Sequence, residues 1–237
     1  MFELGAICAG YGGSSVLHDV TVKVPDGSVA AVVGANGAGK TTLLRVASGL
    51  LRPGSGTVRL DGTDLTGSPP HRYVQSGVCL VPEGRGIFRS LSVRENLRLQ
   101  GRPGRPEAEV VEHATEAFPV LGQRLDQLAG TMSGGEQQML ALARAYVTNP
   151  KVVLLDEVSM GLAPRVLDQI FAFLERLAGQ GSTLVIVEQY VHRALALADF
   201  LYVLSRGSVV FCGEPGEVDV DDLVGGYLGV GLTPVRS

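Results

Sequence analysis

One glycine-rich segment of the sequence contains the residue types that hold a triphosphate. It reads Gly34-Ala35-Asn36-Gly37-Ala38-Gly39-Lys40-Thr41 and is followed by Thr42. The segment matches the phosphate-loop pattern GxxxxGK(S/T), in which glycines let backbone N–H groups converge on an anion. We expect Lys40 to reach the β- and γ-phosphates, Thr41 to ligate Mg²⁺ and Thr42 to contact the α-phosphate. Alone, this loop indicates only a nucleoside triphosphate site.

A second group of candidate residues, Asp156 and Glu157, follows the apolar segment 152–155. Functional groups gather at the carboxyl ends of the strands in a parallel sheet. There Asp156 is expected to hold Mg²⁺ through water, and Glu157 to polarise the water that attacks a phosphoryl group. A solvated acidic turn after a buried strand is the simpler interpretation, but a phosphate loop in the same chain favours the catalytic one.

Segment 131–138 presents a second possible phosphate cradle. Ser133 and Glu136 have the spacing of a helix capping box, and Gly134 and Gly135 lie between them. A capped helix whose first turn carries two glycines presents open backbone N–H groups, which suit a phosphate. One nucleotide does not need two cradles from one chain. We therefore expect two chains to pair head to tail, so that each cradle closes on the nucleotide held by the partner.

Short β-branched segments alternate with helix-like segments along the chain, and these elements must position the candidate residues. Strands are predicted at 20–24, 29–33, 57–60, 78–81, 152–155, 183–187, 201–204 and 209–211. Helices are predicted at 40–48, 92–99, 107–117, 133–147, 166–177 and 191–197. Apolar strands that alternate with helices predict an α/β fold with a parallel sheet covered on both faces. The chain, 1–237, is expected to form a core lobe from 1–84 and 148–237 and an inserted helical lobe from 85–147.

Composition narrows the classes of function. The net charge of −4 argues against non-specific nucleic-acid binding, which needs a basic surface. The apolar segments are far shorter than the roughly 20 residues of a membrane span, so we expect a soluble chain that reaches a membrane only through partners. Cys8, Cys79 and Cys212 lie in apolar runs without metal-binding spacing and are predicted to be buried free thiols.

The three motifs together resemble those of ABC transporter ATP-binding subunits. The run SGGEQ is similar to their signature, usually written LSGGQ, and it lies between the phosphate loop and the acidic strand end, as in that family. The resemblance covers nearly the whole chain. It implies a P-loop NTPase fold with a mostly parallel core sheet, an antiparallel β portion and an inserted helical lobe, and it implies ATP and Mg²⁺ as cofactors. Tyr11 stands where these proteins stack an aromatic ring on adenine, although an ordinary, partly buried tyrosine remains the alternative.

Finer details resemble the LivF-type ATPases of high-affinity branched-chain amino-acid importers. These details are the runs 81–85, 87–88, 130–141, 161–164, 187–189 and 227–229. In this group Glu83 replaces a glutamine that approaches the nucleotide and its metal ion. Gln189 stands where most ABC proteins have a histidine, and it is expected either to donate a hydrogen bond to the γ-phosphate or merely to cap the next helix. Val158 stands where a proline usually follows the catalytic glutamate.

The resemblance also implies partners. The second ATPase subunit would be another copy or a related chain, and the pair would sit on integral permease subunits at the cytoplasmic face of the cell membrane. An extracytoplasmic binding protein would take part indirectly. Apolar residues in the loop 83–91, Ile87, Phe88 and Leu91, are expected either to dock the permease or to pack locally. The alternatives are a sibling importer for urea, amides or other amino acids, and a soluble ABC ATPase without a transport role.

Overall fold

The computed structural model describes residues 1–100, 105–188 and 191–218, and these residues form two β-sheets and eight α-helices. The strands are β1 (Phe2–Tyr11), β2 (Ser14–Val24), β3 (Val29–Val33), β4 (Ser55–Leu60), β5 (Thr63–Asp64), β6 (Val78–Val81), β7 (Val152–Asp156), β8 (Thr183–Val187), β9 (Phe200–Ser205) and β10 (Ser208–Gly213). The helices are α1 (Lys40–Ala47), α2 (Pro70–Ser76), α3 (Val93–Gln100), α4 (Glu107–Ala117), α5 (Pro119–Gly122), α6 (Gly134–Thr148), α7 (Pro164–Gly179) and α8 (Val191–Leu197). Short 3-10 turns lie at Ala129–Thr131 and Pro215–Glu217.

The larger sheet has six strands in the order β10-β9-β3-β8-β7-β6. Its strands from β9 to β6 are parallel, and β10 pairs antiparallel with β9. The smaller sheet, β2-β1-β4-β5, is antiparallel throughout. A mostly parallel core sheet with an antiparallel β portion is therefore confirmed, and so is the α/β fold class.

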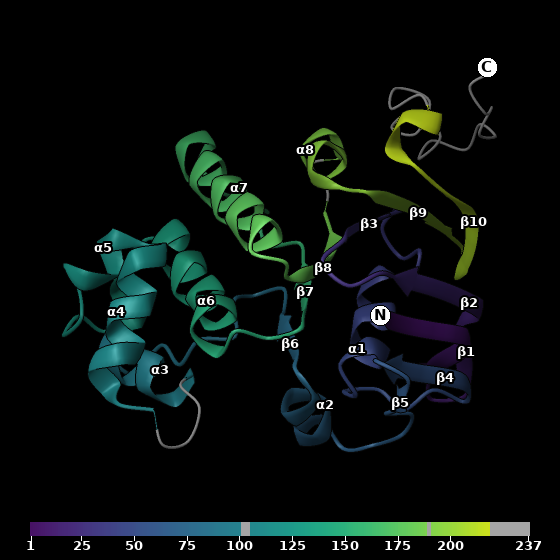
Figure 1. The fold of residues 1–237 in the computed structure, drawn as a ribbon, viewed down its shortest axis with the longest axis horizontal. Helices are drawn as coiled ribbons and strands as arrows, with labels where there is room; N and C mark the ends of the chain where they lie inside the picture. The colour runs from purple at the N-terminus through teal and green to yellow at the C-terminus, as the bar shows by residue number, and fades with distance from the viewer. Residues whose placement is uncertain (101–104, 189–190, 219–237) are drawn as a thin grey trace.

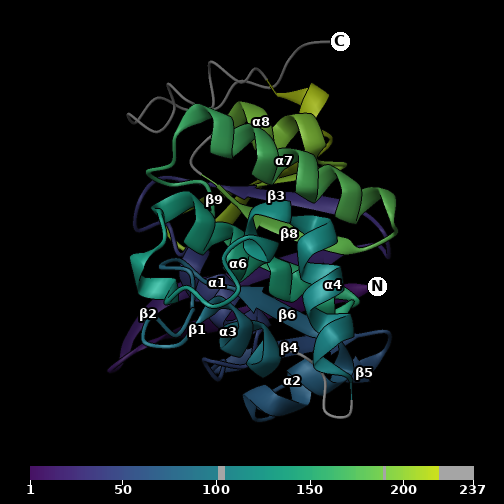
Figure 2. The ribbon, with the colours of Figure 1, turned by 90° about the vertical axis from the view of Figure 1, so that its left-hand side faces the viewer.

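The six-stranded sheet is covered on both faces, as continuous apolar strands predict. Alternate residues of one strand enter different hydrophobic cores: Val32 packs with β1, β2 and α1, whereas Val33 packs with residues of α3 to α8. In the view of Figure 2, α7 and α8 lie above this sheet, while β1 and β4 lie below it. Helix α1 contacts β1, β2 and β7, so it lies between the two sheets.

Helices α3 to α6 gather at one end of the molecule, away from the four-stranded sheet (Figure 1). Their buried residues belong to the same core as one face of the six-stranded sheet, with Leu140 of α6 and Leu155 of β7 as members. The helices predicted between 85 and 147 thus exist and lie together. The division into a core lobe and a helical lobe at these boundaries stays a prediction.

Several elements escaped the sequence prediction for identifiable reasons. Strand β1 has a left-handed backbone at Ala6 (φ 52°), and its pairing with β2 shifts register between Leu4 and Ile7, so its apolar residues do not alternate strictly. Helix α2 buries only Tyr73, which leaves no periodic apolar face. The prediction of buried thiols is wrong for Cys212, which is exposed at the open edge strand β10; Cys79 is buried and Cys8 is half-buried.

None of the helices in the described part of the chain is long and apolar enough to cross a membrane.

Candidate nucleotide-binding site

The phosphate loop forms a tight turn between β3 and α1. Gly39 has φ 108°, a left-handed conformation that side chains rarely adopt, and a Cβ on Gly34 would lie 2.3 Å from the Leu204 carbonyl oxygen. A side chain at either position would therefore strain the backbone or clash with it, so both positions require glycine. Lys40 begins α1, is only 7% exposed, and its Nζ donates to the carbonyl oxygens of Gly34 (2.8 Å) and Ala35 (3.3 Å). Its charge is thus held inside the loop, where a phosphate would lie.

The acidic end of β7 lies beside this loop. The Thr41 hydroxyl donates to Asp156 Oδ1 at 3.2 Å, although the two residues are 115 positions apart in the sequence. Lys40 Nζ and Glu157 Oε1 are 3.8 Å apart. The structure therefore brings together the cation, the hydroxyl and the two carboxylates that the sequence assigned to phosphate chemistry.

One cavity, of about 550 Å³, joins half of the predicted site residues. A volume of this size is typical of small-molecule and cofactor sites. Its lining consists of Val16, Asn36, Gly37, Gly39, Lys40, Thr41, Thr42, Glu83, Glu157 and Met160. Gly34 and Asp156 are not in this lining, but they contact Lys40 and Thr41, which are.

Two lining residues, Val16 and Met160, were not identified from the sequence. Met160 follows Glu157 on the same loop, so its position after the acidic pair was an available signal. Val16 lies on β2 and comes to the cavity through the pairing of β2 with β1, which no sequence motif indicated.

Tyr11, at the end of β1, does not line this cavity. Its side chain is 44% exposed, and its hydroxyl accepts a hydrogen bond from Arg45 at 3.3 Å. The Arg45 guanidinium also lies 6.0 Å from the ring centroid, in a cation–π arrangement. The ring is thus held at the surface by α1, and its role in stacking on adenine stays a prediction.

The oxygen ligands at this site fit Mg²⁺. In the described part of the chain there is no cluster of three or more His, Cys, Asp or Glu side chains that could hold a metal by themselves. Mg²⁺ needs no such cluster, because it usually binds through one or two protein oxygens together with water and substrate phosphates. Thr41 and Asp156 offer two such oxygens 3.2 Å apart, and Glu83 and Glu157 add carboxylates on the cavity wall.

Burial raises the pKa of the Asp156 carboxyl to about 6, against the effect of the hydrogen bond from Thr41. The negative charges of Glu157 and Glu83 raise this pKa further, and the charge of Lys40 lowers it. The ionised carboxylate is therefore destabilised in the nucleotide-free chain. A divalent cation at this point would remove the penalty, because it favours the charged form.

The raised pKa predicts how stability depends on pH. The folded chain holds this proton more tightly than the unfolded chain, so the free energy of unfolding should fall as pH rises from about 4 to about 6, by up to about 3 kcal/mol. Asp156→Asn has no charge to bury and should remove this fall. Urea unfolding without nucleotide or Mg²⁺ should then show the variant to be more stable than the parent at about pH 7, with little difference at about pH 4. Equal stability at the higher pH would contradict the burial penalty.

The second cradle lies elsewhere. Ser133 caps α6, and the capping box is complete: Ser133 N–H donates to Glu136 Oε2 (2.9 Å), and Glu136 N–H donates to Ser133 Oγ (3.3 Å). The two remaining residues of this cradle, Gly134 and Gly135, open the helix. None of the four residues lines the cavity at the phosphate loop of the same chain.

A buried contact joins the loop after Glu157 to the end of β8. Ser159 N–H donates to Glu188 Oε1 at 3.1 Å, and the Ser159 hydroxyl donates to Glu188 Oε2. Glu157 itself has a left-handed backbone (φ 48°), and its N–H donates to the Val187 carbonyl oxygen at 2.8 Å. No sequence motif indicated this contact. Gln189, predicted to act at the γ-phosphate, lies outside the described residues.

A strand, a glycine loop and a helix, set beside a strand that ends in two carboxylates, define a P-loop nucleoside triphosphatase. Within that class, the sequence model of the ABC transporter family matches residues 17–160, which is more than half of the chain. The chain belongs to the ABC transporter family. It is an ATP-binding subunit of that family and hydrolyses ATP.

Individual members of this family and their solved structures are similar to this chain over most of its length. It is 44% identical to the high-affinity branched-chain amino acid transport ATP-binding protein BraG of Pseudomonas aeruginosa, over 89% of this chain and 91% of the relative. It is 38% identical to the probable branched-chain amino acid transport ATP-binding protein LivF of Archaeoglobus fulgidus, over 89% and 90%. Among solved structures it is similar to the ADP conformation of an ATP-binding cassette of an ABC transporter, with TM-score 0.81 and 27% identity over 97% and 99% of the two chains.

Proposed function

We propose that this chain powers the import of branched-chain amino acids by hydrolysing ATP at the cytoplasmic face of the cell membrane. The observation that carries the proposed chemistry is the cavity where the phosphate loop meets the end of β7. The names of the two relatives, each matched over about nine-tenths of its length, support the substrate class. The same chemistry would serve a sibling importer for urea, amides or other amino acids, since the motor does not contact the transported molecule.

The side chains of the cavity would divide the work as follows. Lys40 leaves the carbonyl oxygens of its own loop and compensates the charge of the β- and γ-phosphates. Thr41 and Asp156 would hold Mg²⁺, with Glu83 near its coordination shell. When bound, MgATP supplies the phosphoryl group and part of the charge that stabilises its transfer. Glu157 polarises the attacking water, and Gln189 donates a hydrogen bond to the γ-phosphate.

The site of one chain would be completed by the second cradle of another. Ser133 is exposed, and the residues at the N-terminus of α6 do not line the cavity of their own chain. A head-to-tail dimer, of two copies or of this chain with a related one, would place that helix end on the partner's γ-phosphate. ATP would bind the closed dimer more tightly than the open one, and this difference can move an attached permease.

The loop 83–91 offers a surface for the permease. Buried Asn96 clamps this loop at Phe88, whose N–H donates to Asn96 Oδ1 (2.8 Å) and whose carbonyl accepts from Asn96 Nδ2 (2.9 Å). The Phe88 side chain is nevertheless 58% exposed, while Ile87 packs against the core. Each interpretation of this loop therefore applies to a different residue. Ile87 packs locally, and we propose that Phe88 contacts the permease.

Reconstitution tests this function. The chain would be assembled in proteoliposomes with a permease pair and a binding protein from its own organism. ATP hydrolysis should rise when the binding protein carries leucine, isoleucine or valine, and labelled leucine should accumulate inside. Stimulation by urea or an amide instead would assign the chain to a sibling importer. ATP hydrolysis that ignores every permease would indicate a role outside transport.

The dimer predicts how Ser133→Arg behaves. The bulky cation blocks the helix end that acts on the partner, so the lone variant should still bind ATP with near-parental affinity. Its ATP hydrolysis should fall severely, by about a hundredfold if it removes donors to the transition-state phosphate. Equilibrium binding of a fluorescent ATP analogue and steady-state hydrolysis measure the two effects. Loss of ATP binding by the isolated chain would instead assign this segment to the site of the same chain.

A further inference from the structure

The α6 cradle contains an acidic residue that should hinder its proposed role. Glu136 is the one acidic side chain in the first turn of α6, and this side chain is 16% exposed. A carboxylate there stabilises the free helix end, but it repels a triphosphate that approaches the same N–H groups. A cradle that binds phosphate needs this charge to be compensated.

Arg124 supplies that compensation. Its Nη2 lies 2.8 Å from Glu136 Oε1, while Glu136 Oε2 accepts the Ser133 N–H at 2.9 Å. The carboxylate is therefore held between the arginine and the capping residue of the cradle. The capping box uses the N–H groups of Ser133 and Glu136, and it does not use those of Gly134, which is half-buried, and Gly135, which is buried.

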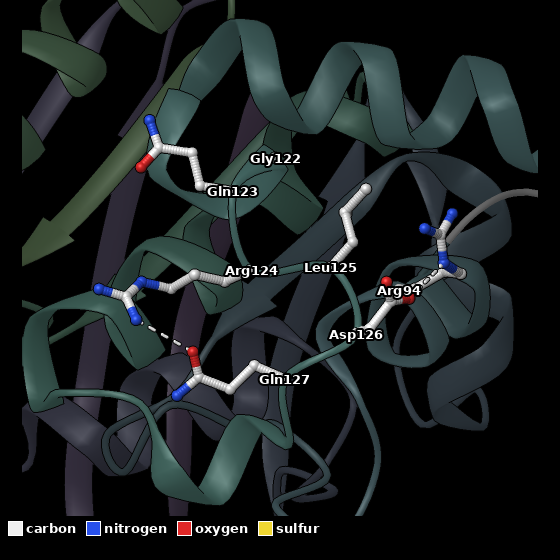
Figure 3. A pocket seen from close by; sticks show the side chains of 7 residues that line it. All are labelled: Arg94, Gly122, Gln123, Arg124, Leu125, Asp126 and Gln127. Atoms are coloured by element: carbon white, nitrogen blue, oxygen red, sulfur yellow. Dashed lines mark hydrogen bonds and ion pairs between the residues drawn. The ribbon is translucent and has the colours of Figure 1, made fainter.

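The loop that carries Arg124 is firmly attached. It follows α5 and pairs with the start of α3, where Val93 N–H donates to the Gln127 carbonyl (3.0 Å) and Arg94 N–H to the Leu125 carbonyl (2.9 Å). Arg124 Nη1 also donates to the Gln127 side chain at 3.0 Å. Figure 3 shows Arg124 turned toward Gln127 and away from Arg94 and Asp126, which pair with each other on the other side of a hollow of about 360 Å³. The Arg124 guanidinium thus contacts Glu136 from a loop that hydrogen bonds attach to the start of α3.

The ion pair of Arg124 with Glu136 lies partly at the surface, since the Arg124 side chain is 39% exposed. Its Nε is nevertheless buried and has no hydrogen-bond partner in the described part of the chain, which carries a free-energy cost. A second arginine reinforces the same helix end. Arg85 Nη2 lies 2.9 Å from where a Cβ on Gly134 would be, and Arg85 donates to the neutral side chain of Gln137. Two guanidinium groups therefore lie near this helix end, that of Arg85 beside Gly134 and that of Arg124 on the Glu136 carboxylate.

We propose that Arg124 is a positioning residue of the ATP site, which neutralises Glu136 so that the N-terminus of α6 can receive the γ-phosphate held by the partner chain. The inference rests on the proposed head-to-tail dimer. Arg124 does not touch the nucleotide; it acts through Glu136 on the charge and orientation of the first turn of α6. The effect of losing Arg124 should therefore depend on whether residue 136 is charged.

A double-mutant comparison tests this dependence. Arg124→Gln alone should lower ATP hydrolysis about tenfold, the size of effect that an uncompensated charge near a phosphate has close to a protein surface. Each variant is compared with its own background, so in Glu136→Gln protein the same change at Arg124 should cost less than about twofold. Arg94→Gln is the matched control, because it removes an equal charge from the same hollow without contacting Glu136, and it should cost less than about twofold.

Two further measurements separate a charge effect from damage to the fold. The isolated Arg124→Gln chain should bind ATP as the parent does, because its own phosphate loop is untouched, and the loss should appear as a higher ATP requirement for hydrolysis. Arg124→Lys, which keeps the charge, should recover most of the activity. Equal losses in both backgrounds, or an equal loss from Arg94→Gln, would overturn the inference while leaving the proposed function intact. A parent protein without ATP hydrolysis would overturn both.

Discussion

Lys40→Ala should abolish ATP hydrolysis, with a loss of at least about a hundredfold to a thousandfold. Lys40 is the buried cation of the cavity, and its Nζ lies 3.8 Å from Glu157 Oε1. No other lysine or arginine lines this cavity in the described part of the chain. Alanine would leave the triphosphate without its compensating charge at the point where charge develops in the transition state. Steady-state phosphate release with MgATP measures the loss.

Lys23→Ala is a suitable control for this variant. Lys23 lies on β2 with its side chain 57% exposed and pairs with Glu3 at the surface. The Lys23→Ala variant should hydrolyse ATP at nearly the parental rate. Near-parental turnover by folded Lys40→Ala protein would show that this loop does not hold the reacting phosphates, and the assignment of the cavity would fail with it.

Glu157→Gln should keep ATP binding and slow hydrolysis by about two to four orders of magnitude, the range typical of losing a general base. Glutamine keeps the shape of the side chain but loses the anion that polarises water. Because the ATP-bound state no longer turns over, the head-to-tail dimer should accumulate. Size-exclusion chromatography with MgATP should show a dimer for the variant and mainly a monomer for the parent.

Glu175→Gln is the control that separates the role of Glu157 from a general effect of lost charge, since Glu175 is exposed on α7 and does not line the cavity. It should leave both hydrolysis and oligomeric state unchanged. A Glu157→Gln protein that stayed monomeric and hydrolysed ATP at the parental rate would refute both the catalytic role and the dimer. If heterodimers are the working form, the trapped species should appear only when the related subunit is added.

The sequence predicted the site best where a single motif specifies the local backbone structure. The run 34–41 specifies a turn between a strand and a helix, and the structure places Lys40 at the start of α1 as expected. Asp156 and Glu157 lie more than a hundred residues from this loop in the sequence. They could still be assigned to the same site, because parallel strands present their carboxyl ends at one edge of the sheet. The hydrogen bond between Thr41 and Asp156 shows why that rule was sufficient.

Contacts that depend on how separate segments pack were not predictable. Val16 reaches the cavity through the hairpin of β1 and β2, and β1 itself was missed because its bulge interrupts the alternation of apolar residues. The ion pair of Arg124 with Glu136 joins two segments whose spacing follows no motif. The same holds for Ser159 and Glu188, where a loop and a strand end meet only after β7 and β8 have paired.

The left-handed backbone of Glu157 has an evolutionary consequence. A non-glycine residue in this conformation costs about 1–2 kcal/mol, and glycine would adopt it freely. Selection for heat resistance and selection for turnover should therefore oppose each other at position 157. A laboratory screen that rewards survival on heating alone would favour glycine there and enrich inactive chains.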